Sequence, residues 1–441
     1  MAVSISSITA TLPSHWKYIS EGGATIVFSY VGPPNPDFDG MVLRLRKSGV
    51  QTPVLEKQAF GTVAEEEEPD DSSIVFQETC MKRLIPPVHL PKLQSVQVEK
   101  AWLEELSRAH QQDRPLQRTV SGGIDTTKSK AVLATDLVGG SGLAVEIKPK
   151  WSFLPNKMYL SAVSCSIKAN TCRFCMHSRM KSKEGETVSL GYCPLDLFSG
   201  NRGRMKQAVH SLYDSWLTSD GTVNNLKIFV KGTKIGVDQA CISHHVRKFS
   251  MFSPEAYEES DENVRETFSE AILTLLVNTP VLRVLNKVQR TLDSLDIEGL
   301  SLLWREAHSP ANPPQSTNGY THSGRAIGVG EPNPSLADWS AFIDEYLTRS
   351  PDLEDLRYHL LAYLLSATFK DCSIMIRMDL LDPRRPQEVV DPSKVTVIDL
   401  DPKNMTRLSK WEKLDETIVR EYSAIPLADR KTCLDDWVDE A

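Results

Sequence analysis

Two aspartates in the C-terminal part of the chain have neighbours that suit chemistry on phosphate groups. Asp399 follows the apolar run 395–398, and Asp401 and Lys403 come directly after it. A carboxylate at the end of a buried strand, beside a second acid and a cation, commonly holds Mg²⁺ against phosphate oxygens. Asp371 lies between a predicted helix and a predicted strand, where a carboxylate can orient a substrate hydroxyl. Aspartates that only cap a turn or end a helix are the alternative interpretation of both positions.

Basic residues are concentrated in one segment of an acidic protein. Between residues 147 and 183 there are eight Lys or Arg and no Asp or Glu, although the whole chain has a formal net charge of −8. Closely spaced cations repel one another unless they share an anion. The segment therefore predicts a site for a small, highly charged anion, most simply one rich in phosphate. A solvated basic surface is the alternative.

The start of this segment has the pattern of a strand end. Leu143, Val145 and Ile147 alternate with Glu146 and with a following lysine, which is the period of a β-strand. A proline at position 149 then interrupts the ladder. Charges at a strand end are well placed to reach into a cleft.

Further cations recur at helical spacing. His177 and Lys181 form an i, i+4 pair, and Lys403, Arg407 and Lys410 would share one face if their segment is helical. The same region contains Cys172 and Cys175 in a Cys-x-x-Cys pattern. Because no second Cys-x-x-Cys or His pair follows at finger spacing, buried reduced thiols are favoured over a zinc site.

A turn near the N-terminus can approach phosphate through its backbone. Gly22, Gly23 and Ala24 precede the strand-like run that begins at Thr25, and Arg44 lies on the next predicted strand. Backbone N–H groups in such a turn can bind an anion. An ordinary turn and a surface arginine explain these residues as well.

Composition limits the class of protein. The chain has 441 residues, enough for two or three domains or one elaborated two-lobed fold. Its negative charge argues against general nucleic-acid binding. Eight cysteines without regular spacing indicate reduced thiols. The N-terminus shows no secretory signal, and the apolar stretch 271–277 is too short to span a bilayer. We expect a soluble protein.

The secondary structure predicted to position these residues changes near residue 140, from mainly strands to mainly helices. Strands are predicted at 25–30, 41–46 and 131–136, with a helix at 96–112 and an acidic, solvated loop at 65–71. A glycine-rich hinge at 139–142 follows. Helices are then predicted at 203–218, 264–298, 336–368 and 408–422, strands at 224–231, 372–378 and 394–399, and a loop at 309–334. The pattern predicts an α+β fold with a β-rich lobe over residues 1–140, a larger α+β lobe over 141–441, and a cleft between them.

Seven short motifs occur in an order that resembles a known family. They are Glu21-Gly-Gly-Ala, Arg114-Pro-Leu-Gln-Arg118, Glu146-Ile-Lys-Pro-Lys150, Arg173-Phe-Cys-Met-His177, Pro194-Leu-Asp-Leu-Phe-Ser-Gly200, Lys370-Asp-Cys-Ser-Ile374 and Ile398-Asp-Leu-Asp-Pro-Lys403. Together they resemble the inositol-pentakisphosphate 2-kinase family from about residue 16 to residue 420. The resemblance implies a two-lobed, kinase-like fold. It also implies transfer of the γ-phosphate of ATP, with Mg²⁺, to the 2-hydroxyl of inositol 1,3,4,5,6-pentakisphosphate, which gives inositol hexakisphosphate (phytate).

The resemblance also implies roles for individual residues. Asp399 would hold Mg²⁺, Asp371 would be the base for the 2-hydroxyl, and Lys148 would take part in catalysis. The nucleotide would be bound by Gly22, Gly23, Ala24, Thr25, Arg44, Asp136 and Glu146. The substrate phosphates would be bound by Arg118, Lys148, Lys150, Arg173, His177, Lys181, Asn225, Lys403 and Arg407. We expect a monomer that does not insert into a membrane and does not bind nucleic acid directly. It would be found in the nucleus or cytoplasm, with the nucleus suggested by family analogy.

The sequence differs from protein kinases and from plant members of the family at several motifs, and these differences narrow the predicted function. Protein-kinase motifs (Gly-x-Gly-x-x-Gly, His-Arg-Asp and Asp-Phe-Gly) are absent from the sequence. Lys227 and Trp411 stand where plant members of the family have Arg and Tyr, and the zinc site of plant members has no counterpart in residues 309–334. A catalytically silent polyphosphate-binding scaffold is the main alternative. An RNA- or phosphoinositide-binding module is disfavoured, since the sequence has no Arg-Gly runs, stacking-aromatic motif or amphipathic basic helix.

Overall fold

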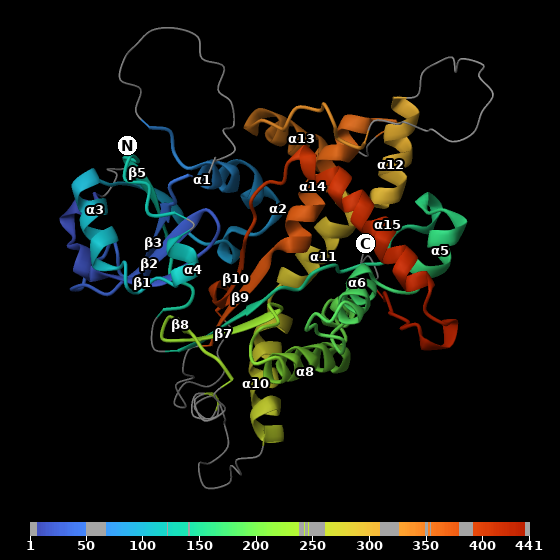
Figure 1. Ribbon diagram of the computed structural model, residues 1–441, viewed down its shortest axis with the longest axis horizontal. Helices are drawn as coiled ribbons and strands as arrows, with labels where there is room; N and C mark the ends of the chain where they lie inside the picture. The colour runs from blue at the N-terminus through green and yellow to red at the C-terminus, as the bar shows by residue number, and fades with distance from the viewer. Residues whose placement is uncertain are drawn as a thin grey trace.

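The fold is built on two antiparallel sheets from different parts of the chain (Figure 1). The computed structural model describes residues 7–49, 68–120, 122–139, 142–237, 242, 246, 261–308, 326–348, 352, 354–378 and 391–436. Within these residues each sheet has five strands, and helices make up most of the remainder. The α+β fold class predicted from the sequence is confirmed, and the arrangement is consistent with a kinase-like, two-lobed fold.

The first sheet comes from the N-terminal part of the chain. Its strand order is β1 (Trp16–Glu21), β2 (Thr25–Tyr30), β3 (Met41–Arg46), β5 (Lys130–Thr135) and β4 (Leu93–Gln97). Ile26, Phe28, Leu43 and Leu45 are buried in one core, which the helix α3 (Lys100–Ala109) also enters. Since side chains alternate along a strand, Arg44 belongs to the opposite face of the sheet.

The second sheet is the frame of the larger core. Its order is β10 (Val395–Ile398), β9 (Ser373–Met378), β6 (Leu143–Ile147), β7 (Leu226–Val230) and β8 (Thr233–Lys234). As predicted, Leu143, Val145 and Ile147 point into the core. Glu146 therefore lies on the other face, where Lys227 is its cross-strand neighbour.

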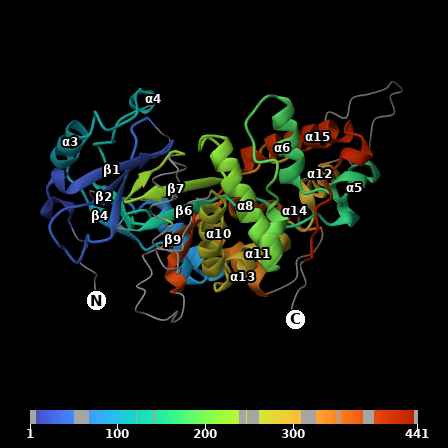
Figure 2. The same ribbon diagram turned by 90° about the horizontal axis from the view of Figure 1, so that it is seen from below.

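Helices cover the second sheet and form the end of the molecule away from the first sheet (Figure 2). There α6 packs on α15, and α15 packs on α5 and α12. The α-helices besides α3 are α1 (Ser72–Phe76), α2 (Lys82–Leu84), α4 (Leu116–Thr119), α5 (Ala162–Lys168), α6 (Arg173–Lys183), α7 (Pro194–Leu197), α8 (Arg202–Thr218), α10 (Asp261–Val277), α11 (Val281–Leu292), α12 (Asp296–Ala307), α13 (Leu336–Thr348), α14 (Leu356–Asp371) and α15 (Leu408–Ser423). Shorter turns are η1 (Ile8–Ala10), η2 (Pro13–His15), η3 (Gln77–Met81, a π-helical turn), η4 (Pro87–His89), η5 (Lys157–Tyr159), η6 (Pro392–Lys394), η7 (Met405–Arg407) and η8 (Leu427–Asp429).

Two long helices predicted from apolar periodicity are broken in the structure. The segment 264–298 belongs to α10, α11 and α12, and Pro280 sits at the N-cap of α11. Proline cannot continue a preceding helix because it lacks the N–H donor and clashes with the preceding turn. The segment 336–368 divides into α13 and α14, and the Asp355 carboxylate caps α14 by accepting a hydrogen bond from Tyr358 N at 3.0 Å. Of the predicted loop 309–334, residues 309–325 lie outside the described residues.

Two carboxylates in the described part of the acidic segment 65–71 are held by hydrogen bonds and ion pairs. Glu68 accepts hydrogen bonds from Ser129 N at 2.6 Å and from Lys130 N at 3.2 Å. Asp71 pairs with Arg46 at 2.5 Å and caps α1. The prediction of a solvated loop is wrong for Glu68 and Asp71, because the sequence pattern did not reveal the cation and amides that bind these carboxylates, whereas residues 69 and 70 between them are exposed as predicted.

One part of the N-terminal sequence packs on the larger core. Phe76, Cys80, Met81 and Leu84, from the helical segment 72–84, are buried together with residues of the second sheet and its helices. The division at residue 140 stays a prediction, as does the hinge, whose residues 140 and 141 lie outside the described residues. Two sheets with separate cores are what the structure shows.

Within the described residues, no single helix is long and apolar enough to cross a bilayer. One pair of helices, Glu262–Val277 and Val281–Ala307, has sufficient combined length and apolar composition but is bent by 65°.

Candidate active site

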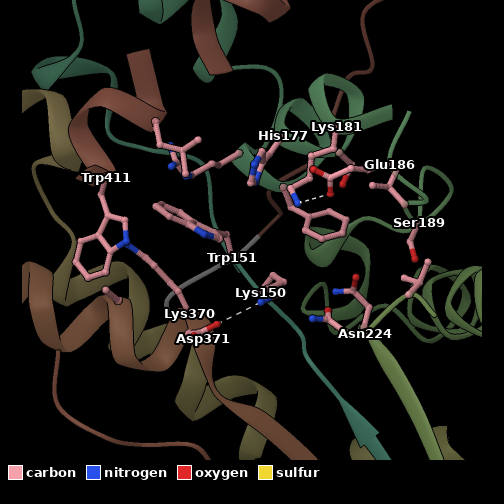
Figure 3. Close-up of a pocket in the computed structure, with 18 of the residues that line it drawn as sticks. Lys150, Trp151, His177, Lys181, Glu186, Ser189, Asn224, Lys370, Asp371 and Trp411 are labelled. Atoms are coloured by element: carbon pink, nitrogen blue, oxygen red, sulfur yellow. Dashed lines mark hydrogen bonds and ion pairs between the residues drawn. The ribbon is translucent and has the colours of Figure 1, made fainter. Parts of the chain in front are cut away.

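A cavity of about 570 Å³ opens where the end of β6, the helix α6, the start of β7 and the helices α14 and α15 meet (Figure 3). Seven of the nine residues predicted to bind substrate phosphates line it, and so does Asp371. The seven are Lys150, Arg173, His177, Lys181, Asn225, Lys403 and Arg407. Residues more than two hundred positions apart in the sequence therefore face one space.

Asp371 is held between two lysines at the edge of this cavity. It is the last residue of α14, and Lys150 Nζ donates to its Oδ1 at 3.3 Å (Figure 3). Lys403 Nζ donates to its Oδ2 at 3.1 Å. Partial burial acts to raise the pKa of Asp371, but the charges of Lys150 and Lys403 outweigh it and the pKa is lowered. The carboxylate is thus ionised at neutral pH, fixed in orientation and ready to accept a proton.

A second polar cluster lies on the face of the second sheet, around Asp399. Lys148 Nζ donates to Asp399 Oδ2 at 3.1 Å and to Ser373 Oγ at 2.8 Å. Ser373 Oγ also contacts Glu146 Oε1 at 2.9 Å and Asp399 Oδ2 at 3.0 Å. Lys227 donates to both oxygens of Glu146, at 3.0 and 2.9 Å. β6, β7, β9 and the end of β10 thus each contribute to one network.

Lys148 is hydrogen-bonded to Asp399 in this network and is influenced by Asp371 through charge alone. Burial acts to lower the pKa of Lys148, but the charges of Asp399, Glu146 and Asp371 raise it above its ordinary value. The lysine is therefore a permanent cation beside Asp399 and Glu146. The Asp399 side chain remains 53% exposed, so it can still coordinate a ligand from solution.

The backbone is strained at both aspartate clusters. Lys150 has φ 66° and Asp399 has φ 62°, in the left-handed region that non-glycine residues rarely adopt. Such strain costs on the order of 1–3 kcal/mol and persists only where the surrounding structure enforces it.

The helix α6 supplies one wall of the cavity. Arg173, His177 and Lys181 recur at i, i+4 and i+8 and all line it, so the predicted helical pairing is confirmed. Burial, helped by the neighbouring charges of Arg173 and Lys181, lowers the pKa of His177 to about 4. Lys181 Nζ is paired with Glu186 at 2.7 Å, just beyond the acid-free segment (Figure 3).

Arg173 is fixed by a buried ionic network. Its guanidinium pairs with Asp415 of α15 and lies over the Trp151 ring at 5.1 Å. Lys168 of α5 contacts the same Asp415 at 2.9 Å and also pairs with Asp296 of α12. Three helices are thereby connected to the start of α6, which limits how far this wall of the cavity can move.

Trp151 and Lys370 belong to the cavity lining although no role was predicted for them. Lys370 Nζ lies 3.9 Å from the centre of the Trp151 ring and pairs with the buried Asp293. Burial lowers the pKa of Lys370. The only sequence signal was the position of each residue beside a predicted site residue. The partner Asp293 is distant in sequence, at the end of α11.

Two predicted substrate residues lie outside the cavity lining, and one predicted pattern is wrong. Lys148 belongs to the Asp399 network. Arg118 lies on α4, and its backbone carbonyl accepts a hydrogen bond from Arg114 Nη2 at 3.3 Å. Lys403, Arg407 and Lys410 do not share a helical face, because α15 begins only at Leu408. Lys403 and Arg407 reach the cavity from the loop and short turn before α15, whereas Lys410 is exposed and does not line it.

The turn predicted to approach phosphate is open on its outer side. A Cβ atom added at Gly22 or Gly23 would meet nothing within 4 Å, so the backbone there is accessible. Glu21, directly before the turn, is fixed by buried ion pairs with Lys47 and, at 2.7 Å, with Arg114. These two cations were not predicted to matter, because the salt bridges join residues that are distant in sequence.

The remaining predicted nucleotide residues lie around the first sheet and its exit. Thr25 begins β2, and the half-buried Arg44 pairs with Val27 and Val132 on the neighbouring strands. Asp136 follows β5 and accepts hydrogen bonds from Ser29 Oγ, Val138 N and Gly139 N. Its carboxylate therefore shapes the turn after β5, and its contact with a nucleotide stays a prediction.

Comparison with known proteins gives one consistent result. The family model described as inositol-pentakisphosphate 2-kinase matches residues 18–417. A Cryptococcus neoformans protein named inositol-pentakisphosphate 2-kinase is 32% identical over 433 residues, covering 95% of both chains. An Arabidopsis thaliana protein of the same name is 27% identical over 453 residues, covering 93% of both chains. A Danio rerio protein of that name is 31% identical over 231 residues, which is 50% of this chain and 44% of that one.

Proposed function

Because the chain belongs to the inositol-pentakisphosphate 2-kinase family, we propose that it transfers the γ-phosphate of ATP to the 2-hydroxyl of inositol 1,3,4,5,6-pentakisphosphate. The product is inositol hexakisphosphate. The observation that carries this proposal is the cavity lined by Asp371 and by seven basic side chains, the six that were predicted and Lys370. A ring with five phosphates carries roughly eight to ten negative charges, since each monoester bears about 1.5–2.

The basic side chains of the cavity come from three directions, as a ring substituted on all sides requires. Lys150 extends from the end of β6; Arg173, His177 and Lys181 extend from α6; Lys403 and Arg407 come from the segment before α15. Asn225, at the start of β7, adds an amide that donates to the Lys148 carbonyl at 3.2 Å. Charge-assisted bonds to phosphate are stronger than neutral ones, so this set can replace the water that five phosphates lose.

Asp371 is the proposed base for the acceptor hydroxyl. The bond that forms joins the 2-oxygen to the γ-phosphorus, and the bond that breaks joins this phosphorus to the β–γ bridging oxygen, whose electron pair leaves with ADP. The hydroxyl proton passes to Asp371. Lys150 and Lys403 keep this carboxylate directed into the cavity, at 3.3 and 3.1 Å. Phosphoryl transfer depends mainly on such positioning and on charge stabilisation.

The nucleotide is proposed to lie between the two sheets. Gly22, Gly23 and Ala24 would cover its phosphates with accessible backbone, Thr25 would add a hydroxyl and Arg44 a charge. Asp136 and Glu146 would line the base and sugar end of the nucleotide site. Near the phosphate that is transferred, Lys148 would neutralise charge on the γ-phosphate from its position beside Asp399.

The residues around Asp399 fit Mg²⁺. Magnesium prefers oxygen ligands, usually one or two carboxylates completed by substrate phosphates and water. One oxygen of the Asp399 carboxylate, Oδ2, accepts hydrogen bonds from Lys148 and Ser373. Because the side chain is half exposed, coordination sites remain open toward solvent. When bound there, the ion would supply charge neutralisation for the phosphates of the nucleotide.

Turnover with defined substrates tests the proposal. Incubated with ATP, Mg²⁺ and inositol 1,3,4,5,6-pentakisphosphate, the protein should release ADP and form inositol hexakisphosphate in equal amounts. Without the acceptor, ADP release should fall to background. Tight inositol phosphate binding with no transfer would select the alternative of a silent scaffold and refute the kinase.

Binding of the substrate should change the protonation of His177. With its pKa at about 4, this side chain is neutral at pH 7 when the cavity holds only water. Phosphate groups beside it would offset the repulsion from Arg173 and Lys181 and raise the pKa toward the ordinary 6.5 or above. The complex would then take up a proton, and the affinity for the inositol phosphate should increase as pH falls through the pKa of His177 in the complex.

NMR titration of the His177 ring, with and without inositol hexakisphosphate, measures this directly. A His177→Gln variant serves as the assignment control and should lose the proton uptake seen by calorimetry in buffers of different ionisation enthalpy. An unchanged His177 pKa in the complex would show that no phosphate lies beside α6.

A further inference from the structure

The cavity carries an acidic side chain that the proposed reaction does not use. Among the described residues that line the cavity, two are acidic, Asp371 and Glu186. Figure 3 shows them on opposite sides of the cavity, so Glu186 cannot share the work of Asp371 at the acceptor hydroxyl. A carboxylate also repels phosphate groups. Its presence in a pocket for five phosphates therefore indicates a role other than proton transfer.

The turn that ends α6 fixes Glu186 beside Lys181. Gly185 adopts the left-handed conformation, with φ 83°, and its N–H donates to the Ser182 carbonyl at 3.2 Å. The Glu186 N–H donates to the Lys181 carbonyl at 3.0 Å. These two bonds form a Schellman motif, which folds the chain back onto the end of its helix. Lys181 Nζ and Glu186 Oε2 are consequently 2.7 Å apart.

This ion pair is held weakly. The C-terminal end of a helix carries a partial negative charge, which favours Lys181 in the last turn of α6 and disfavours a carboxylate there. The side chains of Lys181 and Glu186 are 36% and 50% exposed, so water screens their attraction. Exposed pairs of this kind contribute little to stability. The pair can therefore open when a stronger anion reaches Lys181.

From this geometry we propose that Glu186 is an internal counterion, which occupies Lys181 in the empty cavity and competes with one phosphate of the inositol ring for this lysine. The proposal rests on the proposed function, because that function assigns Lys181 to the substrate. A phosphate monoester carries about 1.5–2 negative charges and a carboxylate carries one, so the phosphate displaces Glu186. The ring binds less tightly than it would to a free Lys181.

The competition should act on substrate and product alike. The phosphate that is transferred arrives beside Asp371, on the opposite side of the cavity, so the phosphates near Lys181 are the same before and after the reaction. A contact that is equal in both states changes binding and leaves the chemical step as it is. Glu186 would thus limit how tightly the cavity retains a product that carries one phosphate more than the substrate.

Calorimetric titration of the full-length protein with inositol hexakisphosphate tests the proposal. Glu186→Gln keeps the size of the side chain but removes its charge, and it should lower Kd by roughly threefold to tenfold. KM for inositol pentakisphosphate should fall by a similar factor, while the rate of a single turnover at saturating substrate stays unchanged. The matched control is Glu184→Gln, since Glu184 caps the same helix, is exposed and does not line the cavity. Its Kd should stay that of the original protein.

Two binding results would overturn the counterion. One is a Glu186→Gln variant that binds as weakly as the original protein or more weakly, which would show that Glu186 positions Lys181 for the ligand. The other is equal tightening in Glu184→Gln, which would assign the effect to net charge. A crystal structure of the unsubstituted protein with inositol hexakisphosphate does not depend on the folding of a variant. It should show Glu186 turned away from Lys181, and an intact pair would contradict the proposal.

The same measurements separate this proposal from the proposed function. Calorimetry needs no turnover, so tightening by Glu186→Gln in a protein that transfers no phosphate would support the counterion and refute only the kinase. Normal turnover of the unsubstituted protein, with no effect of Glu186→Gln on Kd or KM, would support the kinase and refute only the counterion.

Discussion

Asp371→Asn should lower kcat for transfer to inositol pentakisphosphate by roughly 10²–10⁴-fold, the usual contribution of a general base. Asparagine keeps the shape of the side chain but cannot accept the hydroxyl proton. It also removes a negative charge from between Lys150 and Lys403, which now share it at 3.3 and 3.1 Å. The variant should therefore bind the substrate as tightly as the original protein, or more tightly. Steady-state kinetics and calorimetric binding measure the two effects separately.

The matched control for this variant is Asp355→Asn. Asp355 caps the other end of the same helix, α14, and asparagine caps helices as well as aspartate does. We expect its turnover to stay close to that of the original protein. If Asp371→Asn also keeps full turnover, or if it loses binding and thermal stability together with kcat, Asp371 is a structural residue and the assignment as base is wrong.

Asp399→Asn should lower kcat by a comparable ~10²–10⁴-fold, which corresponds to several kcal/mol of lost charge stabilisation. Asparagine tolerates the left-handed backbone at this position, where φ is 62°, so the effect should not come from misfolding. The amide is a poor replacement for a carboxylate ligand. The concentration of Mg²⁺ needed for half-maximal activity should therefore rise, which a magnesium titration at saturating ATP measures.

Asp391→Asn provides the same chemical change eight residues earlier. Its carboxylate caps η6 by accepting from Ser393 N at 2.9 Å, a role that asparagine can fill. This control should keep both the rate and the magnesium dependence. An Asp399→Asn variant with an unaltered magnesium dependence would remove Asp399 from the proposed metal site, even if its rate were low.

Local patterns were enough to predict much of the site. The alternation around Glu146 placed Lys148 and Lys150 correctly at a strand end, and the spacing of His177 and Lys181 placed them correctly on one face of a helix. Each of these inferences needs only neighbours within a few residues. They hold because strand and helix periods are set locally, by backbone geometry.

Features that depend on contacts between distant segments could not be predicted in this way. The Lys370–Asp293 pair, the network of Arg173 with Asp415 and the grouping of Cys433 with Cys172 and Cys175 all join residues far apart in sequence. Apolar periodicity likewise continued through Pro280, where the chain in fact starts a new helix. A charge or thiol shows its partner only after folding brings the segments together.

The central claim is that cations scattered along the chain surround one inositol ring in front of Asp371. A crystal structure with inositol pentakisphosphate, Mg²⁺ and a non-hydrolysable ATP analogue tests it most directly. The account predicts the ring in the cavity, with phosphates on Lys150, His177 and Lys403 and the 2-hydroxyl within about 3 Å of the Asp371 carboxylate. A ring bound elsewhere, or turned so that another hydroxyl faces Asp371, would contradict it.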